Sequence, residues 1–460
     1  MYQIDFNDPC RIHFIGIGGI SMSGLAEILL SEGFQVSGSD IRETGLTKHL
    51  ESLGARVTIG QRASNIDDPD VVVYTAAIHP DNEELCEAKH RGIPLLTRAE
   101  LLGELMKNYG EAIDIAGTHG KTTTTSMVTE ILMYAGKDPT VTVGGILDSI
   151  GGNIRVGASD FFVAEACEYT NSFLSFYPTI EVILNVEADH LDFFKDLDDI
   201  RHSFKLFIKR LPQDGRGFLV INGDIKDLDY FVSDIGCDYV TFGSSKANDY
   251  SAEDISYDEL GHPSYTLIKE GEELGRVELS VNGIHNVYNS LAAIAVAERL
   301  GIPIYDAKRA LKGFKGTERR FEYKGEVEGF TIIDDYAHHP QEIEATIEAA
   351  RLYPHKKLWV AFQPHTYTRT KALLSDFAKA LSMADEVILT DIYAAREQNV
   401  VGISSLDLAE KIREAGGHVE YIKEFEDIEK FILNNLETGD LLITMGAGNI
   451  VDVADQLISK

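Results

Sequence analysis

The sequence predicts an α/β protein of three domains, each built on a largely parallel sheet. The chain has 460 residues, which is more than one hydrophobic core accommodates. Short apolar segments of strand character alternate with helical patterns along most of its length. Two glycine-rich segments, near residues 16 and 117, each join a predicted strand to a predicted helix. We expect a Rossmann-like domain at 1–107, a central domain of P-loop ATPase type at 108–313, and a Rossmann-like doubly wound domain at 314–460.

The first domain is predicted from a regular alternation of strands and helices. Strands are expected at 11–16, 35–39 and 71–75, and an amphipathic helix at 21–31. Because strands separated by helices are joined by right-handed crossovers, this sheet should be parallel.

The second domain should open at 113–125, where an apolar strand runs through the second glycine-rich segment into a helix. Buried strands are expected at 161–166 and 181–186, and hairpins between about 215 and 282. A glycine-rich, basic segment at 312–320 is interpreted as the junction to the third domain. There, five buried strands separated by helical patterns predict a further doubly wound sheet, at 331–334, 358–362, 386–390, 418–422 and 441–445.

Composition excludes several classes of protein. The formal net charge is −32, from 42 Lys and Arg against 74 Asp and Glu, so we expect neither nucleic acid nor an acidic membrane as a partner. No segment approaches the roughly 20 apolar residues of a membrane helix, and no basic leader precedes the first apolar run, which predicts a cytoplasmic protein. The four cysteines, Cys10, Cys86, Cys167 and Cys237, are far apart and form no CxxC pair. We therefore expect reduced, mostly buried thiols and no zinc site.

The second glycine-rich segment has the features of a phosphate-binding loop. Its sequence, IDIAGTHGKTTTT, places Gly117 and Gly120 between a strand and a helix, where backbone N–H groups converge on an anion. Lys121 would neutralise the β- and γ-phosphates of a nucleotide, and the Thr122 hydroxyl would bind Mg²⁺. A strict Walker motif requires glycine where the chain has Ile115, so an ordinary strand-to-helix turn is the alternative.

The first glycine-rich segment approximates the dinucleotide-binding fingerprint. Gly16, Gly18 and Gly19 follow a strand and open a helix, but Ser21 replaces the third glycine. An NAD-dependent oxidoreductase would use this turn and leave the Gly-Lys-Thr segment unexplained. A second site for a nucleotide diphosphate therefore fits the chain better.

Polar residues gather at the ends of several predicted strands, where ligands bind in α/β sheets. Glu165 and His190 are candidate Mg²⁺ ligands, with solvated loop residues as the alternative. Asn286 either caps a helix or binds an adenine edge. Arg319 and Arg320 either contact a γ-phosphate or lie on a solvated hinge, and the hinge is the weaker interpretation for Arg320.

Taken together, these segments resemble the Mur ligases of peptidoglycan synthesis over essentially the whole chain. The resemblance rests on HFIGIGGISMSGLAEIL, SGSD, GTHGKTTTT, NVEADHLD, HNVYNSLAA, ERRFE, DDYAHHP and FQPHTYTRT, in that order. It implies an ATP- and Mg²⁺-dependent ligase that joins L-alanine to UDP-N-acetylmuramate through an acyl phosphate, acting as a monomer or homodimer. A murein-peptide recycling ligase of the same family and a non-catalytic nucleotide-sensing scaffold are the alternatives.

The resemblance also implies roles for individual residues. UDP-substrate contacts would come from Gly16, Gly18, Gly19, Ile20, Ser21, Ser39, Asp40 and Thr75. ATP would be held by Gly117, Thr118, His119, Gly120, Lys121, Thr122, Thr123, Asn286, Asn289, Arg320 and Asp335. The metal ligands would be Thr122, Glu165 and His190. The amino acid would meet Tyr336, His338 and Arg369, and the muramoyl carboxylate would lie near them and His365. The catalytic set would be Lys121, His190, Arg320, His338, His365 and Arg369.

Three departures from the family pattern stand out. EACEYTNSFL replaces a more acidic EADES-like stretch after the metal glutamate, although Glu165 and Glu168 are present. Thr366 stands where some members have arginine, which leaves amino-acid carboxylate binding mainly to Arg369. Ser203 occupies the place of the carbamylated lysine of sister ligases, so that modification is not expected.

Overall fold

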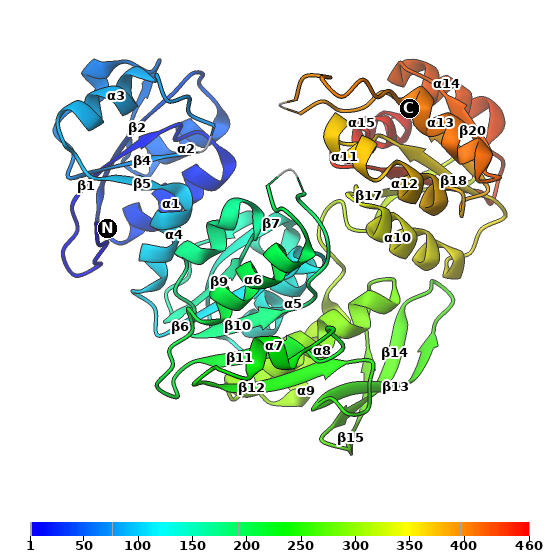
Figure 1. Ribbon diagram of the computed structural model, residues 1–460, viewed down its shortest axis with the longest axis horizontal. Helices are drawn as coiled ribbons and strands as arrows, with labels where there is room; N and C mark the ends of the chain where they lie inside the picture. Colours follow the sequence, from blue (N-terminus) through cyan, green and yellow to red (C-terminus); the bar gives the residue numbers. More distant parts are fainter. Residues whose placement is uncertain (1, 76, 192, 396, 460) are drawn as a thin grey trace. The chain divides into compact units, whose positions relative to one another are not determined.

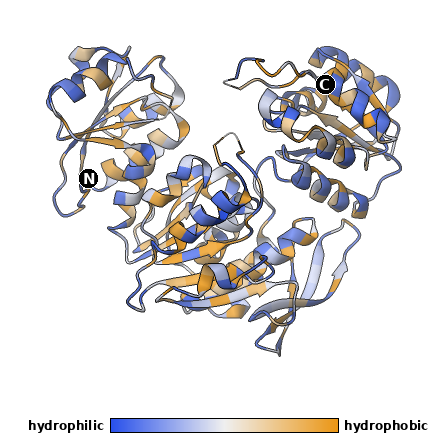
Figure 2. Cartoon of the chain, viewed as in Figure 1, coloured by the Kyte–Doolittle hydropathy of each residue, from blue (hydrophilic) through white to orange (hydrophobic). Residues whose placement is uncertain are grey.

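The computed structural model describes residues 2–75, 77–191, 193–395 and 397–459, which form three separate sheets with helices around them (Figure 1). The predicted three-domain α/β fold class is confirmed. The strands that carry the sheets, such as β4, β18 and β21, are apolar along most of their length (Figure 2). In the part of the chain that the structure describes, no helix has the length and apolar character needed to cross a membrane.

The first sheet has five parallel strands in the order β3-β2-β1-β4-β5. Its strands are β1 (Arg11–Ile15), β2 (Gln35–Asp40), β3 (Arg56–Ile59), β4 (Val71–Tyr74) and β5 (Leu95–Thr97). Its helices are α1 (Ile20–Ser31), α2 (Gly45–Ser52), α3 (Glu83–His90) and α4 (Arg98–Met106), with a 3₁₀ turn η1 (Ala63–Asn65). The order places the β1–α1 turn at a reversal of strand order, where α/β sheets bind ligands.

The second sheet has ten strands in the order β15-β14-β13-β12-β11-β10-β6-β9-β7-β8. Its strands are β6 (Glu111–Ala116), β7 (Thr140–Leu147), β8 (Gly152–Arg155), β9 (Phe161–Glu165), β10 (Ile180–Ile183), β11 (Phe218–Asn222), β12 (Asp238–Gly243), β13 (Tyr250–Tyr257), β14 (Pro263–Lys269) and β15 (Glu272–Glu278). The helices of this region are α5 (Lys121–Tyr134), α6 (Leu197–Ile208), α7 (Asp229–Val232), α8 (Ile284–Arg299) and α9 (Ile304–Gly313), with 3₁₀ segments η2 (Asp148–Ile150) and η3 (Tyr169–Ser175).

The prediction of hairpins between about 215 and 282 is confirmed for β13, β14 and β15 and wrong for β11. β11 pairs parallel with β10, and β12 pairs parallel with β13; only β13, β14 and β15 are joined as antiparallel hairpins. The short helix α7 lies between β11 and β12 along the chain.

The third sheet has six strands in the order β16-β17-β21-β18-β19-β20. Its strands are β16 (Glu322–Val327), β17 (Phe330–Asp335), β18 (Leu358–Phe362), β19 (Glu386–Leu389), β20 (Val419–Tyr421) and β21 (Leu441–Met445). Its helices are α10 (Pro340–Leu352), α11 (Tyr367–Ala372), α12 (Leu374–Leu381), α13 (Ser405–Glu414), α14 (Phe425–Asn435) and α15 (Val451–Ile458). The two apolar faces pack against α10, α12 and α13 on one side and α14 and α15 on the other. β16, an antiparallel edge strand, was not predicted.

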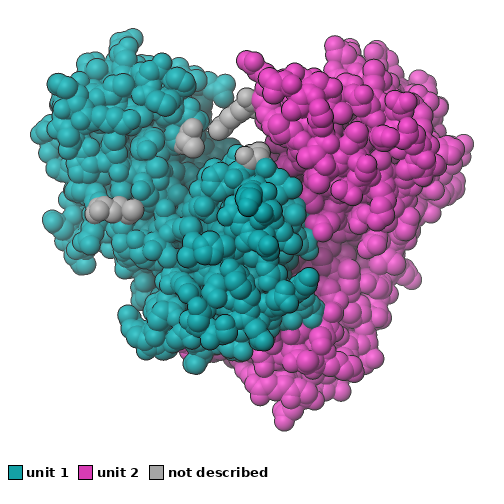
Figure 3. Space-filling model, in the orientation of Figure 1, with its two compact units in different colours: residues 1–121, 132–144, 150–240 teal, residues 122–131, 145–149, 241–460 magenta. Residues whose placement is uncertain are grey.

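By density of contacts the described chain divides into two compact units (Figure 3). Unit 1 comprises 1–121, 132–144 and 150–240, and unit 2 comprises 122–131, 145–149 and 241–460. The domain boundaries at 107/108 and 313/314 stay predictions.

The cysteines differ from the expectation of mostly buried thiols. All four are free, but only Cys237 is buried; Cys86 is exposed, and Cys10 and Cys167 are partly exposed. The prediction of burial is therefore wrong for most of them.

Two carboxyl groups lie side by side in the core of the second sheet. Asp114 on β6 is directly opposite Glu181 on β10, and both side chains are fully buried. Their four oxygens have no hydrogen-bond partner among the described residues. Burial raises the pKa of both groups well above the usual range, and the neighbouring Asp114 raises that of Glu181 further. Folding therefore favours the protonated form of both carboxyls.

We predict that Glu181→Gln becomes stabilising relative to the parent protein as pH rises from 5 to 8. The unfolded chain ionises Glu181 near its normal pKa whereas the folded chain keeps the proton, so the parent loses up to about 1.4 kcal/mol of stability per pH unit in this interval. The measurement is the difference in Tm between variant and parent at each pH. Exposed Glu348→Gln is the control, and a difference that is constant with pH would contradict the prediction.

Candidate active site

The phosphate loop joins the end of β6 to the start of α5. Gly117 and Gly120 have φ of 148° and 85°, in the region that favours glycine. A Cβ on Gly117 would lie 2.9 Å from the Cβ of Leu184, so a side chain does not fit. Asn185, just beyond β10, fixes the loop: its side-chain Oδ1 accepts a 2.7 Å bond from the His119 N–H, and its carbonyl accepts from Thr118 N–H. The loop is a rigid cradle lined by backbone groups.

Lys121, the first residue of α5, is held inside unit 1 by Glu168. Its Nζ lies 3.0 Å from Glu168 Oε2 and also donates to the carbonyls of Gly117 and Thr118. The side chains of Lys121 and Glu168 are 13% and 3% exposed. Burial acts to lower the pKa of Lys121, but the charge of Glu168, with Cys167 and Glu165, raises it above its usual range. The site therefore carries a fixed ammonium group with a carboxylate beside it.

The predicted metal ligands lie next to this pair or on the helix that follows it. Glu165 is the last residue of β9, and its Oε2 accepts a 2.9 Å bond from Gly144 N–H. His190 has a φ of 52°, and its Nε2 is 3.8 Å from Glu168 Oε1. Thr122 is buried on α5, in unit 2.

Carboxylate and hydroxyl oxygens suit Mg²⁺. No group of three or more His, Cys, Asp or Glu within 2–75, 77–191, 193–395 and 397–459 is arranged to hold a metal by itself. Mg²⁺ usually takes only one or two ligands from the protein and the others from phosphates and water.

The amino-terminal glycine turn is a second, separate cradle. The carboxylate of Asp40, at the end of β2, accepts a 2.8 Å bond from Gly18 N–H, and a Cβ on Gly18 would lie 2.8 Å from the same oxygen. The Ser39 carbonyl accepts from the N–H groups of Gly16 and Ile17. Gly19 is the N-cap of α1 and makes no side-chain cap bond, and the N–H groups in the first turn of such a 12-residue helix can bind an anion.

The other residues predicted for the UDP substrate are placed differently. Thr75 lies beside the turn, 3.4 Å from where a Cβ on Gly16 would be, and Ile20 is 65% exposed at the start of α1. The buried Ser39 hydroxyl donates to Glu84 at 2.6 Å, so this side chain points into the core and is already used there.

Asn286 and Asn289 lie buried on α8. Asn286 Nδ2 donates to the Asn282 carbonyl at 2.7 Å, and its Oδ1 accepts from Asn289 Nδ2 at 2.9 Å. Gly283 is the N-cap of this helix, so the alternative interpretation of Asn286 as a cap is wrong. A pocket of about 520 Å³ in unit 2 lies close by and is lined in part by Asn282, Phe321 and Arg320. Asp335 Oδ2 accepts from Phe321 N–H, and burial raises the pKa of Asp335 to about 6.

The residues predicted for the amino acid come together at the ends of β17 and β18. The rings of Tyr336 and His338 are 5.3 Å apart, those of His338 and His365 5.9 Å, and Arg369 Nη1 is 3.4 Å from His365 Nδ1. The Arg320 guanidinium lies 5.2 Å from the centre of the Tyr336 ring. The structure thus gathers five predicted residues from three segments of the chain.

Both histidines in this cluster are neutral at physiological pH. Burial lowers the pKa of His365 to about 4, with His338 and Arg369 acting in the same direction. Burial also lowers the pKa of His338. His338 Nδ1 lies 2.9 Å from the Tyr336 carbonyl and must donate to it, so Nε2 carries the free lone pair of a base.

Comparison with known proteins decides the family. Profiles of the Mur ligase family match three successive regions: the catalytic domain at 11–110, the middle domain at 115–297, and the glutamate ligase domain at 319–448. The chain belongs to the Mur ligase family.

Similar proteins span the full length of the chain. UDP-N-acetylmuramate–L-alanine ligases of Lachnospira eligens and Agathobacter rectalis are 61% and 56% identical, with 100% of each chain covered. Among solved structures, the UDP-N-acetylmuramate–alanine ligase of Thermotoga maritima is 31% identical with a TM-score of 0.79, and 98% of each chain is covered. A murein peptide ligase of Psychrobacter arcticus is 25% identical with a TM-score of 0.68, again over 98% of each chain. As a Mur ligase, this chain is an ATP-dependent amide-bond-forming ligase.

Within this Mur ligase, the paired arginines have different surroundings. Arg319 Nε lies 2.9 Å from the buried Asp334 Oδ2, and its other nitrogens donate to the carbonyls of Gly446 and Gly448. The guanidinium of Arg320 makes no hydrogen bond or ion pair with any described residue, and Arg320 lines the pocket beside α8. The hinge alternative for Arg319 is wrong, because its side chain ties β17 to the loop after β21.

Sequence patterns missed Asn185 as the residue that holds the phosphate loop, and they gave Glu168 no partner. They also missed Arg98, the first residue of α4, which lines a pocket with Glu165. Asn185 lies near the end of a predicted strand beside the loop, which could have indicated its role. Arg98 lies in no motif.

We predict that Arg319→Ala lowers the stability of the third domain by about 3 kcal/mol, because it leaves the buried Asp334 carboxylate without its cation. Arg320→Ala should change stability by less than about 1 kcal/mol and instead reduce turnover. Thermal unfolding and steady-state rates of the two variants provide the test. Equal Tm values for the two variants would contradict the assignment.

Proposed function

We propose that this Mur ligase joins L-alanine to the lactyl carboxylate of UDP-N-acetylmuramate, converting ATP to ADP and phosphate. The observation that carries the proposal is the presence of two independent anion cradles in one chain, one holding Lys121 and one formed by Gly16–Ser21. A ligase that activates a nucleotide-linked acid with ATP needs both. The full-length relatives that carry this activity in their names support the choice of substrates.

The first step of the proposed reaction is phosphoryl transfer. An oxygen of the lactyl carboxylate attacks the γ-phosphorus of ATP, the bond to the bridging oxygen breaks, and ADP leaves behind an acyl phosphate. Lys121 neutralises the transferring group, and it does so by exchanging part of its contact with Glu168 for phosphate oxygens. Thr122, Glu165 and His190 would hold Mg²⁺, which supplies further positive charge on the phosphates.

The second step forms the amide bond. The neutral amine of alanine attacks the acyl carbon, and the tetrahedral adduct releases phosphate. Arg369 would bind the alanine carboxylate, and His338 Nε2 would take the proton that the ammonium loses. The low pKa of His338 keeps it in the base form at neutral pH. No side-chain nucleophile is required, because the substrates react with one another when they are positioned.

Arg320, Asn286, Asn289 and Asp335 complete the proposed ATP site, in which the pocket beside α8 would take the adenosine. The two asparagines hold each other in place, which fixes the surface of α8. The cytoplasmic location and the monomeric or dimeric state stay predictions.

The direct test is product formation with a panel of amino compounds. With ATP, Mg²⁺ and UDP-N-acetylmuramate present, L-alanine should give phosphate release and a product whose mass equals acid plus alanine minus water. Glycine and L-serine should react more slowly. Preference for L-alanyl-γ-D-glutamyl-meso-diaminopimelate would assign the chain to murein-peptide recycling instead, and release without any acid substrate would contradict ligation.

We further predict that Lys121→Ala lowers kcat by about 10²- to 10³-fold, since it removes a fixed charge from the transferring phosphoryl group. Binding of UDP-N-acetylmuramate, measured by calorimetry without ATP, should be unchanged because the glycine turn is held by Asp40 and Ser39. Lys246→Ala, at a surface pair with Glu253, is the control, and circular dichroism verifies folding. Equal loss of turnover and acid binding would contradict two separate cradles.

A further inference from the structure

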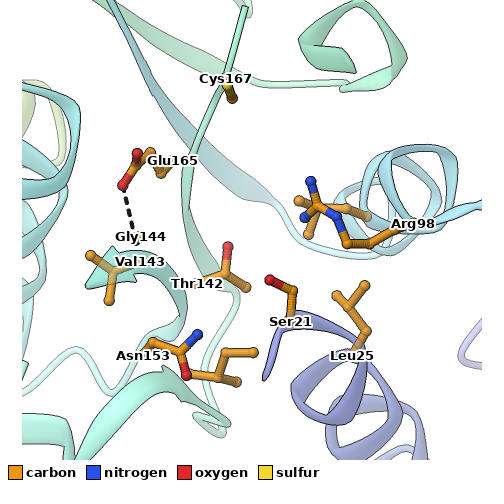
Figure 4. A pocket seen from close by; sticks show the side chains of 11 residues that line it. Ser21, Leu25, Arg98, Thr142, Val143, Gly144, Asn153, Glu165 and Cys167 are labelled. Carbon is orange, nitrogen blue, oxygen red and sulfur yellow. Dashed lines mark hydrogen bonds between the residues drawn. The ribbon is translucent and has the colours of Figure 1, made fainter. Parts of the chain in front are cut away.

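A pocket of about 180 Å³ lies within unit 1 (Figure 4). Ser21 and Leu25 of α1 and Arg98 of α4 line one side, and residues of β7, β8 and β9 line the other. The residues with polar side chains that line it are Ser21, Arg98, Thr142, Asn153, Glu165 and Cys167. None of the roles assigned above uses Arg98.

Arg98 is the only basic residue among those that line this pocket. Its guanidinium makes no hydrogen bond or ion pair with any residue in the described ranges, although the side chain is partly buried. Burial lowers the pKa of Arg98, but a guanidinium stays charged in proteins. A partly desolvated cation without an anion is unfavourable, and binding an anionic ligand would relieve it. A carboxylate can take two parallel bonds from such a group.

The helices α1 and α4, which line one side of the pocket, are tightly packed against neighbouring segments. A Cβ on Gly24 of α1 would lie 1.7 Å from the Ile154 side chain, and one on Gly103 of α4 would lie 1.9 Å from the Ser175 carbonyl oxygen. Arg98 is also the first residue of a helix whose start is fixed by a capping box between Thr97 and Glu100. The guanidinium is therefore presented from a rigid frame, as a positioning group requires.

We infer that Arg98 binds the lactyl carboxylate of the acid substrate and positions it for attack on ATP. This inference rests on the proposed function and deepens it. The pocket faces Glu165, a proposed Mg²⁺ ligand, and Cys167, whose neighbour Glu168 holds Lys121. The carboxylate must reach the γ-phosphate at that end, whereas the diphosphate has its own cradle at the glycine turn. Arg98 thus takes the role that the sequence had given to the carboxyl-terminal cluster, which is left to the amino acid.

The test compares two ligands that differ in the lactyl group. Calorimetry on Arg98→Ala, Arg98→Gln and Arg98→Lys would use UDP-N-acetylmuramate and UDP-N-acetylglucosamine, which has the same diphosphate and no carboxylate. We expect Arg98→Ala and Arg98→Gln to weaken the binding of UDP-N-acetylmuramate by about 10- to 100-fold, which corresponds to the loss of a charged hydrogen bond. The binding of UDP-N-acetylglucosamine should be unchanged. Arg98→Lys should recover part of the loss. The KM for UDP-N-acetylmuramate should rise, and those for ATP and alanine should not.

The matched control is Arg91→Ala. Arg91 is exposed at the C-terminal end of α3 and forms an ion pair with Glu87 of that helix. Equal weakening of both ligands would assign Arg98 to the diphosphate and overturn the inference, as would unchanged binding of both. Arg98→Gln keeps much of the side-chain volume, so it reports on charge if Arg98→Ala unfolds. Turnover by the parent protein tests the proposed function separately. If the parent ligates alanine but the Arg98 variants bind the two ligands with equally changed affinity, only the inference about Arg98 is contradicted.

Discussion

The buried ion pair between Lys121 and Glu168 is the interaction on which the proposed chemistry depends. A protein with a net charge of −32 repels phosphates unless positive charge is concentrated where they bind. Lys121 supplies that charge at the start of α5, and Glu168 keeps it ionised and in place despite burial. The same carboxylate contacts His190, so one residue links the phosphate loop to a proposed metal ligand. Exchange of partners at Lys121 would then couple nucleotide binding to the arrangement of the metal site.

Around this pair, rigidity comes from close packing of backbone. The phosphate loop and the glycine turn both lie where strands end. In each, a glycine stands at a position where the Cβ of any other residue would collide with a neighbouring side chain. Carbonyls and side chains of neighbouring strand ends, from Asn185 and Asp40, hold the two turns. Substrate groups would therefore meet hydrogen-bond donors that are already in place. Such donors stabilise a transition state without the free-energy cost of reorganising the protein during the reaction.

Sequence patterns predicted the strands and the main turns well where hydrophobic periodicity was strong. β18 and β21 begin and end where expected, because each is a continuous apolar run buried on both faces. Patterns failed for β11 and β12, since alternation alone does not distinguish a parallel strand from a hairpin strand. They also failed for β16, an edge strand in which every residue is exposed or only partly buried.

At the candidate site, patterns identified residues but not their partners. Local sequence showed two adjacent arginines and could not show that Arg319 is used by Asp334 while Arg320 stays available. The same limit applies to Ser39, whose hydroxyl is directed at the distant Glu84, and to Arg98, whose meaning comes only from the pocket around it. Each of these facts depends on contacts between residues far apart in the chain, which no short motif encodes.

The central claim is that a carboxylate oxygen of the acid substrate bonds to the γ-phosphorus of ATP in the cradle around Lys121. The most direct measurement uses UDP-N-acetylmuramate labelled with ¹⁸O in both lactyl carboxylate oxygens. Mass spectrometry of the phosphate released during synthesis should find one ¹⁸O atom per molecule, with the other retained in the amide. Unlabelled phosphate would contradict the account.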